Sequence, residues 1–364
     1  MHSNNTIHKI ALSKLHGFGS VRIAQLTSKM GGIDDIFSSS IQEIYLQSGF
    51  SKSLLREMKR DEALVFAEKE WNYCEKNQLQ HLFLLDENYP RRLKQCQDAP
   101  IMLYFKGTCD LNQKKIVSIV GTRNETNYGQ KILEELVSAF AHKNILVVSG
   151  LAYGVDIRAH RLCLENKIET VAVLGHGLDR IYPSSHRSTA SKMIQNGGLL
   201  TEFPSNTNPD RENFPMRNRI IAGLSDATIV IESKESGGSM ITADLANDYS
   251  RDVFAYPGDV DRMYSAGCNA LIKNQKAHLI TKSADLLKIM NWENKTIKKQ
   301  KLIALDLSSE EQEIVHLLNE QGEVHVDTVI QALRLQPSKL SVLLFNLELK
   351  NVIQSLRGNR ISLM

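Results

Sequence analysis

The sequence predicts an α/β protein in which a doubly wound, mainly parallel sheet of extended Rossmann-like type lies between a helical N-terminal domain and a C-terminal winged helix. Two observations predict the sheet: short β-branched runs that are apolar on both faces, and a glycine turn that closes each run before a helical pattern. Strands buried on both faces and alternating with helices indicate a parallel sheet. A third observation, a polar and basic stretch near residue 293, separates the sheet from a second small domain.

Length and composition set broad limits on the protein class. A chain of 364 residues, 42% of them hydrophobic, is long enough for two or three globular domains. The formal net charge of +3 permits nucleic-acid binding only as a local site. Five scattered cysteines without a Cys-x-x-Cys pair predict neither a disulfide scaffold nor a metal site. No run approaches the roughly 18 apolar residues of a membrane span, and no signal pattern is visible, so we expect a cytoplasmic protein without a membrane partner.

Residues 1–80 are predicted to form a small helical domain of helix-hairpin-helix or SAM-like type. Its apolar residues fall at helical spacing and are interrupted by short glycine turns. The turn Gly17-Phe18-Gly19 resembles a helix-hairpin-helix turn, whose amides can hold a DNA phosphate. A plain turn between two helices explains the same three residues, and the sequence leaves both interpretations open.

Residues 81–292 are predicted to form the sheet domain, with a connecting stretch up to residue 107. The expected strands are 115–120, 145–149, 170–174 and 227–231, and the glycine turns that follow them contain Gly121, Gly150, Gly175 and Gly237. Parallel strands all end at one edge of a sheet, so these turns should line one crevice. Glycine lets backbone amides approach a ligand, and each following helix directs its positive N-terminus toward it. Several such turns predict a site for an anion larger than one phosphate.

Residues 293–303 are predicted to be a linker and residues 304–364 a winged-helix domain. The segment 308–311 has the pattern of a capped helix start, and Pro337 opens another helix. The segments 352–355 and 361–363 flank Gly358 and predict a terminal hairpin, which completes three helices and a wing.

The turns of the sheet domain exclude the common cofactor sites. The first turn lacks the Gly-x-Gly-x-x-Gly spacing, no acidic residue follows the second strand, and no phosphate-loop motif is present, so no cofactor is expected. Asp156 and His160 share a helix face and could form a relay, although helix capping by Asp156 explains the pair better. Glu202 and Glu232 follow strands and could act as bases, but spacing assigns them no partner. We therefore identify no catalytic residues.

The segment 214–224 places an aromatic ring, two arginines and an asparagine at the start of an apolar helix. Arg217 offers a planar donor fork suited to phosphate, and Phe214 a flat face on which a base could stack. A salt-bridged helix start with Phe214 in the core would have the same sequence, so the residues alone leave two interpretations. Arg217 and Arg219 point about 200° apart on a helix, so we expect only Arg217 to share a site with Phe214 and Arg219 to be structural.

A series of motifs in the sheet domain resembles the DNA-processing protein A family, also called DprA or Smf. The matching motifs are Tyr89-Pro90, the segment 100–107, Val120-Gly121-Thr122-Arg123, the segment 149–156 with His160, the segment 173–178 with Tyr182-Pro183, the segment 214–224, the segment 236–243, Pro257-Gly258 and the segment 267–272. The helical and winged-helix domains fit one arrangement found in that family.

The resemblance implies a protein that is not an enzyme. It implies binding of single-stranded DNA, loading of the RecA recombinase during natural transformation, single-strand binding protein as a further partner, and a homodimer formed through the sheet domain. It also implies that Arg123 binds backbone phosphate and that Phe214 stacks on a base. The full set of implied DNA-binding residues is Gly121, Thr122, Arg123, Ser149, Gly150, Arg211, Phe214, Arg217, Asn218, Gly237, Gly238 and Ser239.

The chain departs from the family pattern in places that matter for function. Arg211 stands where many relatives have a lysine, and the segment 275–277 replaces a Gly-Ala pair for a reason that we cannot give. The helix that opens at Pro337 carries only Lys339 and Lys350, which favours protein contact over reading of a major groove and argues against a transcriptional regulator. A nucleoside-monophosphate phosphoribohydrolase of the lysine-decarboxylase-like type is the alternative function, although the glutamate of its glycine-rich loop is unmatched and only Glu202 or Asp244 could replace it.

Overall fold

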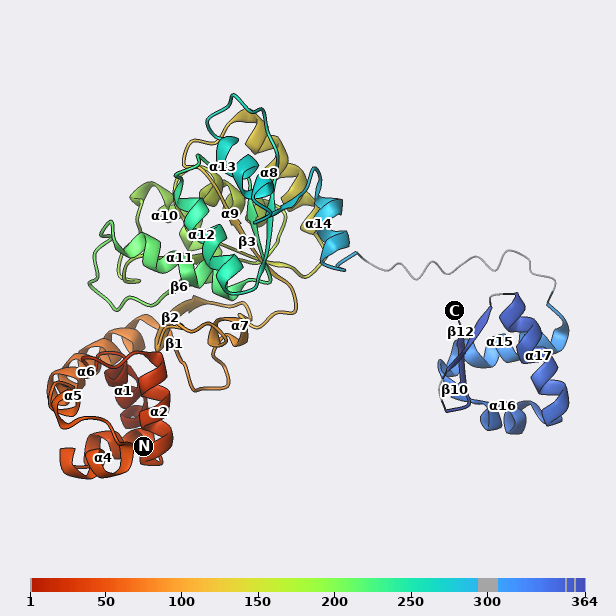
Figure 1. Ribbon diagram of the computed structural model, residues 1–364, viewed down its shortest axis with the longest axis horizontal. Helices are drawn as coiled ribbons and strands as arrows, with labels where there is room; N and C mark the ends of the chain where they lie inside the picture. Colours follow the sequence, from red (N-terminus) through yellow and green to blue (C-terminus); the bar gives the residue numbers. More distant parts are fainter. Residues whose placement is uncertain (1, 294–306, 351, 357, 364) are drawn as a thin grey trace. The chain divides into compact units, whose positions relative to one another are not determined.

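The computed structural model describes residues 2–293, 307–350, 352–356 and 358–363. They form two compact units, the first covering Met1–Glu293 and the second Asn294–Met364 (Figure 1). The helical part and the sheet therefore belong to one unit. The expected boundary at residue 80 falls where the first strand begins, and it stays a prediction. The expected linker, residues 293–303, lies almost entirely outside the described residues.

The first unit begins with a helical part whose apolar spacing predicted it correctly. Its helices are α1 (His2–Leu12), α2 (Ser20–Met30), α3 (Ile33–Ser38), α4 (Ile41–Ser48), α5 (Lys52–Arg56) and α6 (Arg60–Asn77). Ile10, Leu26 and Ile44 are buried in one core together with Phe83 and Tyr104 from the sheet. Because burying such side chains contributes about 1.5–3 kcal/mol each, this shared core explains why the helical part and the sheet form a single unit.

The sheet contains nine strands within the described residues, in the order β1-β2-β6-β5-β4-β3-β7-β8-β9. Their bounds are β1 (Gln80–Phe83), β2 (Met102–Gly107), β3 (Ile116–Val120), β4 (Leu146–Ser149), β5 (Thr170–Val173), β6 (Gly197–Thr201), β7 (Ala227–Val230), β8 (Asp252–Ala255) and β9 (His278–Leu279). From β6 to β9 all pairs are parallel, whereas β1 pairs with β2, and β2 with β6, antiparallel. The predicted mainly parallel sheet is confirmed, but the stretch 81–107 is not a mere connection, because it supplies β1 and β2.

Helices cover both faces of the sheet, as a doubly wound fold requires. The helices are α7 (Arg91–Lys94), α8 (Asn127–Phe140), α9 (Val155–Glu165), α10 (Arg187–Gln195), α11 (Asn213–Leu224), α12 (Gly238–Asp248), α13 (Ala266–Lys273) and α14 (Ser283–Ile289), with a short 3-10 turn at Ser184–His186. Alternate residues of β3 enter opposite cores: Val117 packs on the side of α8, α9 and α14, and Ile116 on the side of α11, α12 and α13. This double burial is the reason that β3 is apolar at nearly every position.

The second unit is the predicted winged helix. Its elements are α15 (Ser309–Gln321), β10 (Val324–His325), α16 (Val326–Leu333), α17 (Pro337–Leu349), β11 (Ile353–Leu356) and β12 (Arg360–Leu363). The strands form an antiparallel sheet in the order β10-β12-β11. Ser308 and Glu311 form the expected capping box at the start of α15.

Candidate functional site

An open groove of about 730 Å³ lies where the order of the parallel strands reverses. β3 pairs with β4 on one side and with β7 on the other, and the turns that follow β3 and β7 line the groove. Ligands of open α/β sheets bind at such a switch point, outside the carboxyl ends of the strands. The crevice expected from the glycine turns is therefore present.

The backbone of the turn after β3 is held close to the sheet, which fixes the position from which the Arg123 side chain extends. The amide of Thr122 donates to the carbonyl of Glu232 at 2.8 Å. A Cβ atom on Gly121 would lie 2.6 Å from the side chain of Val155, so only glycine fits beneath the turn. Arg123 is exposed and lines the groove.

The turn after β7 leads into α12, whose N-terminus also lines the groove. Gly237 caps this helix without a side-chain hydrogen bond, which leaves amides of the first turn open to a ligand. Gly238 and Ser239 line the groove as well, and the Ser239 hydroxyl lies 2.8 Å from that of Ser233. Glycine and serine thus place backbone amides at the surface of the groove.

The first two turns of α11 form the third side of the groove with Phe214, Arg217 and Asn218. Arg219, two residues beyond Arg217, points away and donates to Glu202 and to the carbonyl of Asp98. The opposite directions of the two arginines agree with their spacing on a helix, and the structural role expected for Arg219 agrees with its ion pair.

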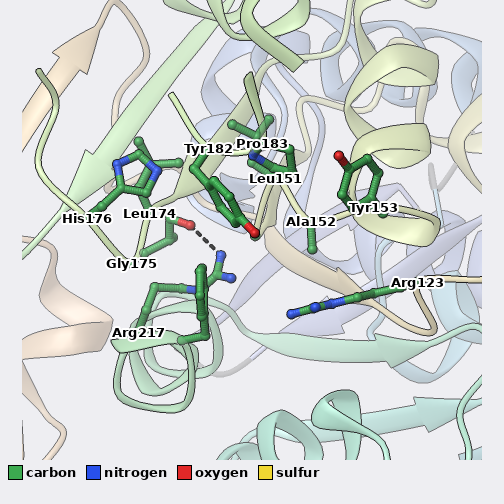
Figure 2. A pocket seen from close by; sticks show the side chains of 13 residues that line it. Arg123, Leu151, Ala152, Tyr153, Leu174, Gly175, His176, Tyr182, Pro183 and Arg217 are labelled. Carbon is green, nitrogen blue, oxygen red and sulfur yellow. Dashed lines mark hydrogen bonds between the residues drawn. The ribbon is translucent and has the colours of Figure 1, made fainter. Parts of the chain in front are cut away.

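Arg217 is a buried residue at the bottom of the site, not an exposed side chain that extends into solvent. Its side chain donates to the carbonyl of Val173, and only 5% of the residue is exposed (Figure 2). A Cβ atom on Gly150 would lie 2.3 Å from a guanidinium nitrogen of Arg217 and 2.5 Å from the Asp156 carboxylate, so both side chains pack on this glycine. Burial lowers the pKa of Arg217 to about 10; the charge of Asp156 opposes this shift, and the charge of Arg123 adds to it less strongly. Arg217 therefore stays charged at neutral pH.

A small side pocket opens beside the groove between Phe214 and the turns after β4 and β5. Gly150 and His176 line it, and Arg123 extends toward it from the opposite side (Figure 2). The rings of Tyr182 and Phe214 lie 6.0 Å apart between centroids and are tilted by 38°. The pocket thus places flat apolar ring faces beside the two guanidinium groups of Arg123 and Arg217. Burial lowers the pKa of His176, which favours the neutral form of this side chain.

Most of the residues singled out in the sequence come together at this site. Those that line the groove or its side pocket are Gly121, Thr122, Arg123, Gly150, Arg211, Phe214, Arg217, Asn218, Gly237, Gly238 and Ser239. Ser149 does not line either space: it is fully buried, and its hydroxyl donates to the carbonyl of Ile119 at 2.6 Å. Ser149 therefore supports the turn from behind.

Sequence reasoning missed three groove residues that carry rings or charge. Tyr182, Lys234 and Tyr264 line the groove, and the Lys234 ammonium lies 5.4 Å from the centre of the Tyr264 ring. Tyr182 had been noted only as part of a motif, and nothing local distinguishes Lys234 or Tyr264. Among the described residues that line the groove, four are cationic and one, Asp156, is acidic. The groove therefore favours an anion.

The candidate catalytic residues do not form a set at the groove. His160 is buried with its Nδ1 2.7 Å from the Thr170 hydroxyl, and Asp156 accepts from the amide of Ala152 at 3.4 Å. Glu202 pairs with Arg219 and lines a different cavity, and Asp244 pairs with Lys276 at 2.8 Å. These positions remove the support for a phosphoribohydrolase that uses Glu202 or Asp244. No cluster of metal-ligating side chains was found among the described residues, and none of the described helices is long and apolar enough to cross a membrane.

Comparison with known proteins identifies the family. Residues 80–291 match the model of DNA recombination-mediator protein A, and residues 299–359 match that of the DprA winged helix domain. The chain belongs to this family. The first of these ranges includes every described strand of the large sheet and every groove residue, so the match covers the part of the chain that builds the site.

Individual relatives agree with this assignment. The chain is 34% identical to Protein Smf of Synechocystis over 280 residues, which cover 75% of this chain and 70% of that protein. It is 39% identical to DNA processing protein DprA of Streptococcus pneumoniae over 204 residues, 56% of this chain and 72% of that protein.

Two solved structures of family members resemble the fold. The X-ray structure of DprA from Streptococcus pneumoniae has a TM-score of 0.65 at 32% identity, and covers 78% of this chain and 97% of its own. DNA processing protein A from Helicobacter pylori, whose structure concerns its single-stranded DNA binding mode, has a TM-score of 0.54 at 30% identity over 59% of this chain and 96% of its own.

Proposed function

We propose that the groove binds single-stranded DNA. The observation that carries this proposal is the convergence of Arg123, Arg211 and Phe214 on one groove at the carboxyl edge of the sheet. Arginine forks suit phosphate oxygens, and the open N-terminus of α12 adds backbone donors of the same polarity. The membership of the chain in a DNA-processing family supports the proposal.

The arrangement favours single strands over duplex. Phe214 and Tyr182 offer ring faces beside the cationic groups, and a base can stack on such a face only when it has left its own stack. In a duplex the bases are paired and stacked, so only the phosphates would be available. The side pocket beside Phe214 would take one unstacked base.

For the role of the protein beyond DNA binding, we reason from its family. We infer that the protein dimerises through the sheet domain and loads RecA onto single-stranded DNA in natural transformation, with single-strand binding protein as a further partner. We also infer that it binds DNA without chemical change, which the separate partners of Asp156, His160 and Glu202 support.

Binding of labelled oligonucleotides, followed by fluorescence anisotropy at two salt concentrations, tests the DNA proposal. We expect tighter binding of single strands than of duplex, with an affinity that falls steeply as salt rises. Arg123→Ala should weaken binding and lower the salt dependence, and Phe214→Ala should cost about 1–3 kcal/mol per stacked base. Equal affinity for duplex, or indifference to Arg123→Ala, would contradict the proposal.

The RecA role is tested separately from DNA binding. Purified protein should speed the assembly of RecA on DNA already coated with single-strand binding protein. Arg123→Ala should lose this effect together with DNA binding. A wild-type protein that binds the DNA but never speeds RecA assembly would overturn the loading role alone.

A further inference from the structure

A buried carboxylate of the helical part is bound to the loop that forms one wall of the groove. Glu70 lies on α6 and is only 3% exposed. It accepts hydrogen bonds from the amide of Ser205 at 2.9 Å and from the Ser205 hydroxyl at 2.6 Å. A buried carboxylate is costly unless it is hydrogen-bonded. The Cys74 thiol on the same helix makes only a long contact of 3.9 Å, so the two short hydrogen bonds both come from one residue of the loop.

The loop, residues 203–212, runs from β6 to α11 without regular secondary structure, and we call it the groove wall. Beyond Ser205, the amide of Asn206 donates to Asp179 at 2.9 Å, and the carbonyl of Thr207 accepts from the amide of Gly177 at 3.2 Å. The carbonyl of Asn208 accepts from the side chain of Asn213 at 3.0 Å. The groove wall is thus fixed by point contacts, and Glu70 supplies one of them from the helical part.

The far end of the groove wall faces the groove. Pro209 and Arg211 line it, and Phe214 follows at the start of α11. Arg211 is exposed, and its side chain has no hydrogen bond or ion pair with the residues that the structure describes. Its position therefore depends on the backbone of the groove wall.

We propose that Glu70 is a positioning residue for DNA, through which the N-terminal helical part sets the affinity of the groove. Glu70 holds the groove wall in the conformation that presents Arg211 to the strand. This inference rests on the proposed DNA-binding function. Without the contact between Glu70 and Ser205, the groove wall is in the DNA-binding conformation for only a fraction of the time. The apparent dissociation constant for DNA is then the intrinsic one divided by that fraction.

Affinity and salt dependence of the full chain test the role of Glu70. Glu70→Ala should weaken single-strand binding by about fivefold, as expected if the wall is competent about a fifth of the time. The slope of log affinity against log salt should fall by up to about 0.7, the value for one lost phosphate contact on a single strand. Glu68→Ala, which removes an exposed acid from the same helix, is the matched control and should bind like the wild type.

A double mutant distinguishes an effect of Glu70 through the position of Arg211 from an effect through the stability of the whole protein. If Glu70 acts through Arg211, then Glu70→Ala combined with Arg211→Ala should bind no more weakly than Arg211→Ala alone. Effects that multiply would overturn the proposal. Glu70→Gln should restore affinity to within about twofold, because the amide can still accept from the Ser205 amide and donate to the hydroxyl.

Further variants keep the test decisive if Glu70→Ala does not fold. Ser205→Ala removes only the hydroxyl bond and should weaken binding in the same direction, without further loss in the background of Arg211→Ala. If Arg123→Ala loses binding while Ser205→Ala matches the wild type and Arg211→Ala has no effect, the positioning role is wrong and the proposed DNA-binding groove is retained. If Arg123→Ala also has no effect, the proposed function fails, and this inference with it.

Discussion

The most constrained residue of the site is Gly150, which lies against two buried charges. Gly150→Ala would place a methyl group 2.3 Å from a guanidinium nitrogen of Arg217 and 2.5 Å from the Asp156 carboxylate. Both partners are buried and cannot move into solvent, so we expect unfolding to become easier by about 1–3 kcal/mol. Urea denaturation measures the change. Gly238→Ala is the matched control, because no atom lies within 4 Å of its added methyl group, and a loss there as large as at Gly150 would contradict the argument.

His160 makes stability depend on pH. Burial first, and then the charges of Arg217 and His186, lower the pKa of His160 to about 3. The unfolded chain takes up the proton near pH 6.5 whereas the folded chain does not, so the stability that His160 provides is fully present above pH 6.5 and is lost as the pH falls toward 3. Between pH 7 and pH 5 the loss should be about 2 kcal/mol.

The contribution of His160 is measured as a difference between two proteins. His160→Asn keeps a polar atom near Thr170 but does not titrate, so its unfolding free energy should fall less between pH 7 and pH 5. The buried carboxyls Asp156 and Glu202 have raised pKa values and act in the opposite direction, but they are present in both proteins and cancel. Identical pH profiles for the two proteins would show that His160 takes up its proton as readily in the folded chain as in the unfolded one, which would contradict the prediction.

At the scale of elements, the sequence predicted what depends on local pattern. The runs that became β3, β4, β5 and β7 are mostly apolar stretches, and their glycine turns line the groove or its side pocket as expected. β1 and β2 were missed because β2 joins the sheet through β6, which lies about a hundred residues away, and β1 joins it only through β2; pairing at such distance leaves no local signal. Lys234 and Tyr264 were missed for the same reason, since they meet only when the loops after β7 and β8 fold together.

Glu232 links two elements that build the groove. Its carboxylate, at the end of β7, accepts from the amide of Thr126 at 2.9 Å and from the Thr126 hydroxyl at 2.7 Å, just before α8. Glu232→Ala leaves these donors without a partner, so unfolding should become easier by about 2–4 kcal/mol and single-strand binding should weaken, because the turn with Arg123 loses its support. Exposed Glu235 provides the control, and a Glu232→Ala protein as stable as Glu235→Ala would refute the link.

At the scale of the whole molecule, the two units differ in what they can offer to DNA. In the second unit Lys339, Lys350 and Arg360 pair with Glu310, Glu311 and Glu323. Helix α17 directs Val342, Phe345 and Leu349 to solvent, each at least 59% exposed. Phosphate binding needs free cations, and Arg334 is the one Lys or Arg without an ion pair among the described residues of this unit. The described part of the unit is therefore a poor DNA surface, which agrees with the shortage of basic residues on its Pro337 helix.

A chain ended after Glu293 should therefore bind single-stranded DNA almost as well as the full chain. The core of the second unit shares no residue with the cores of the first, so the shortened chain should fold. We expect a dissociation constant within about twofold of the full chain and an unchanged salt slope, because the same phosphate contacts remain. Anisotropy titrations at two salt concentrations measure both quantities. A shallower salt slope for the shortened chain would mean that cations beyond residue 293 contact the strand, and the groove would then be only part of the DNA site.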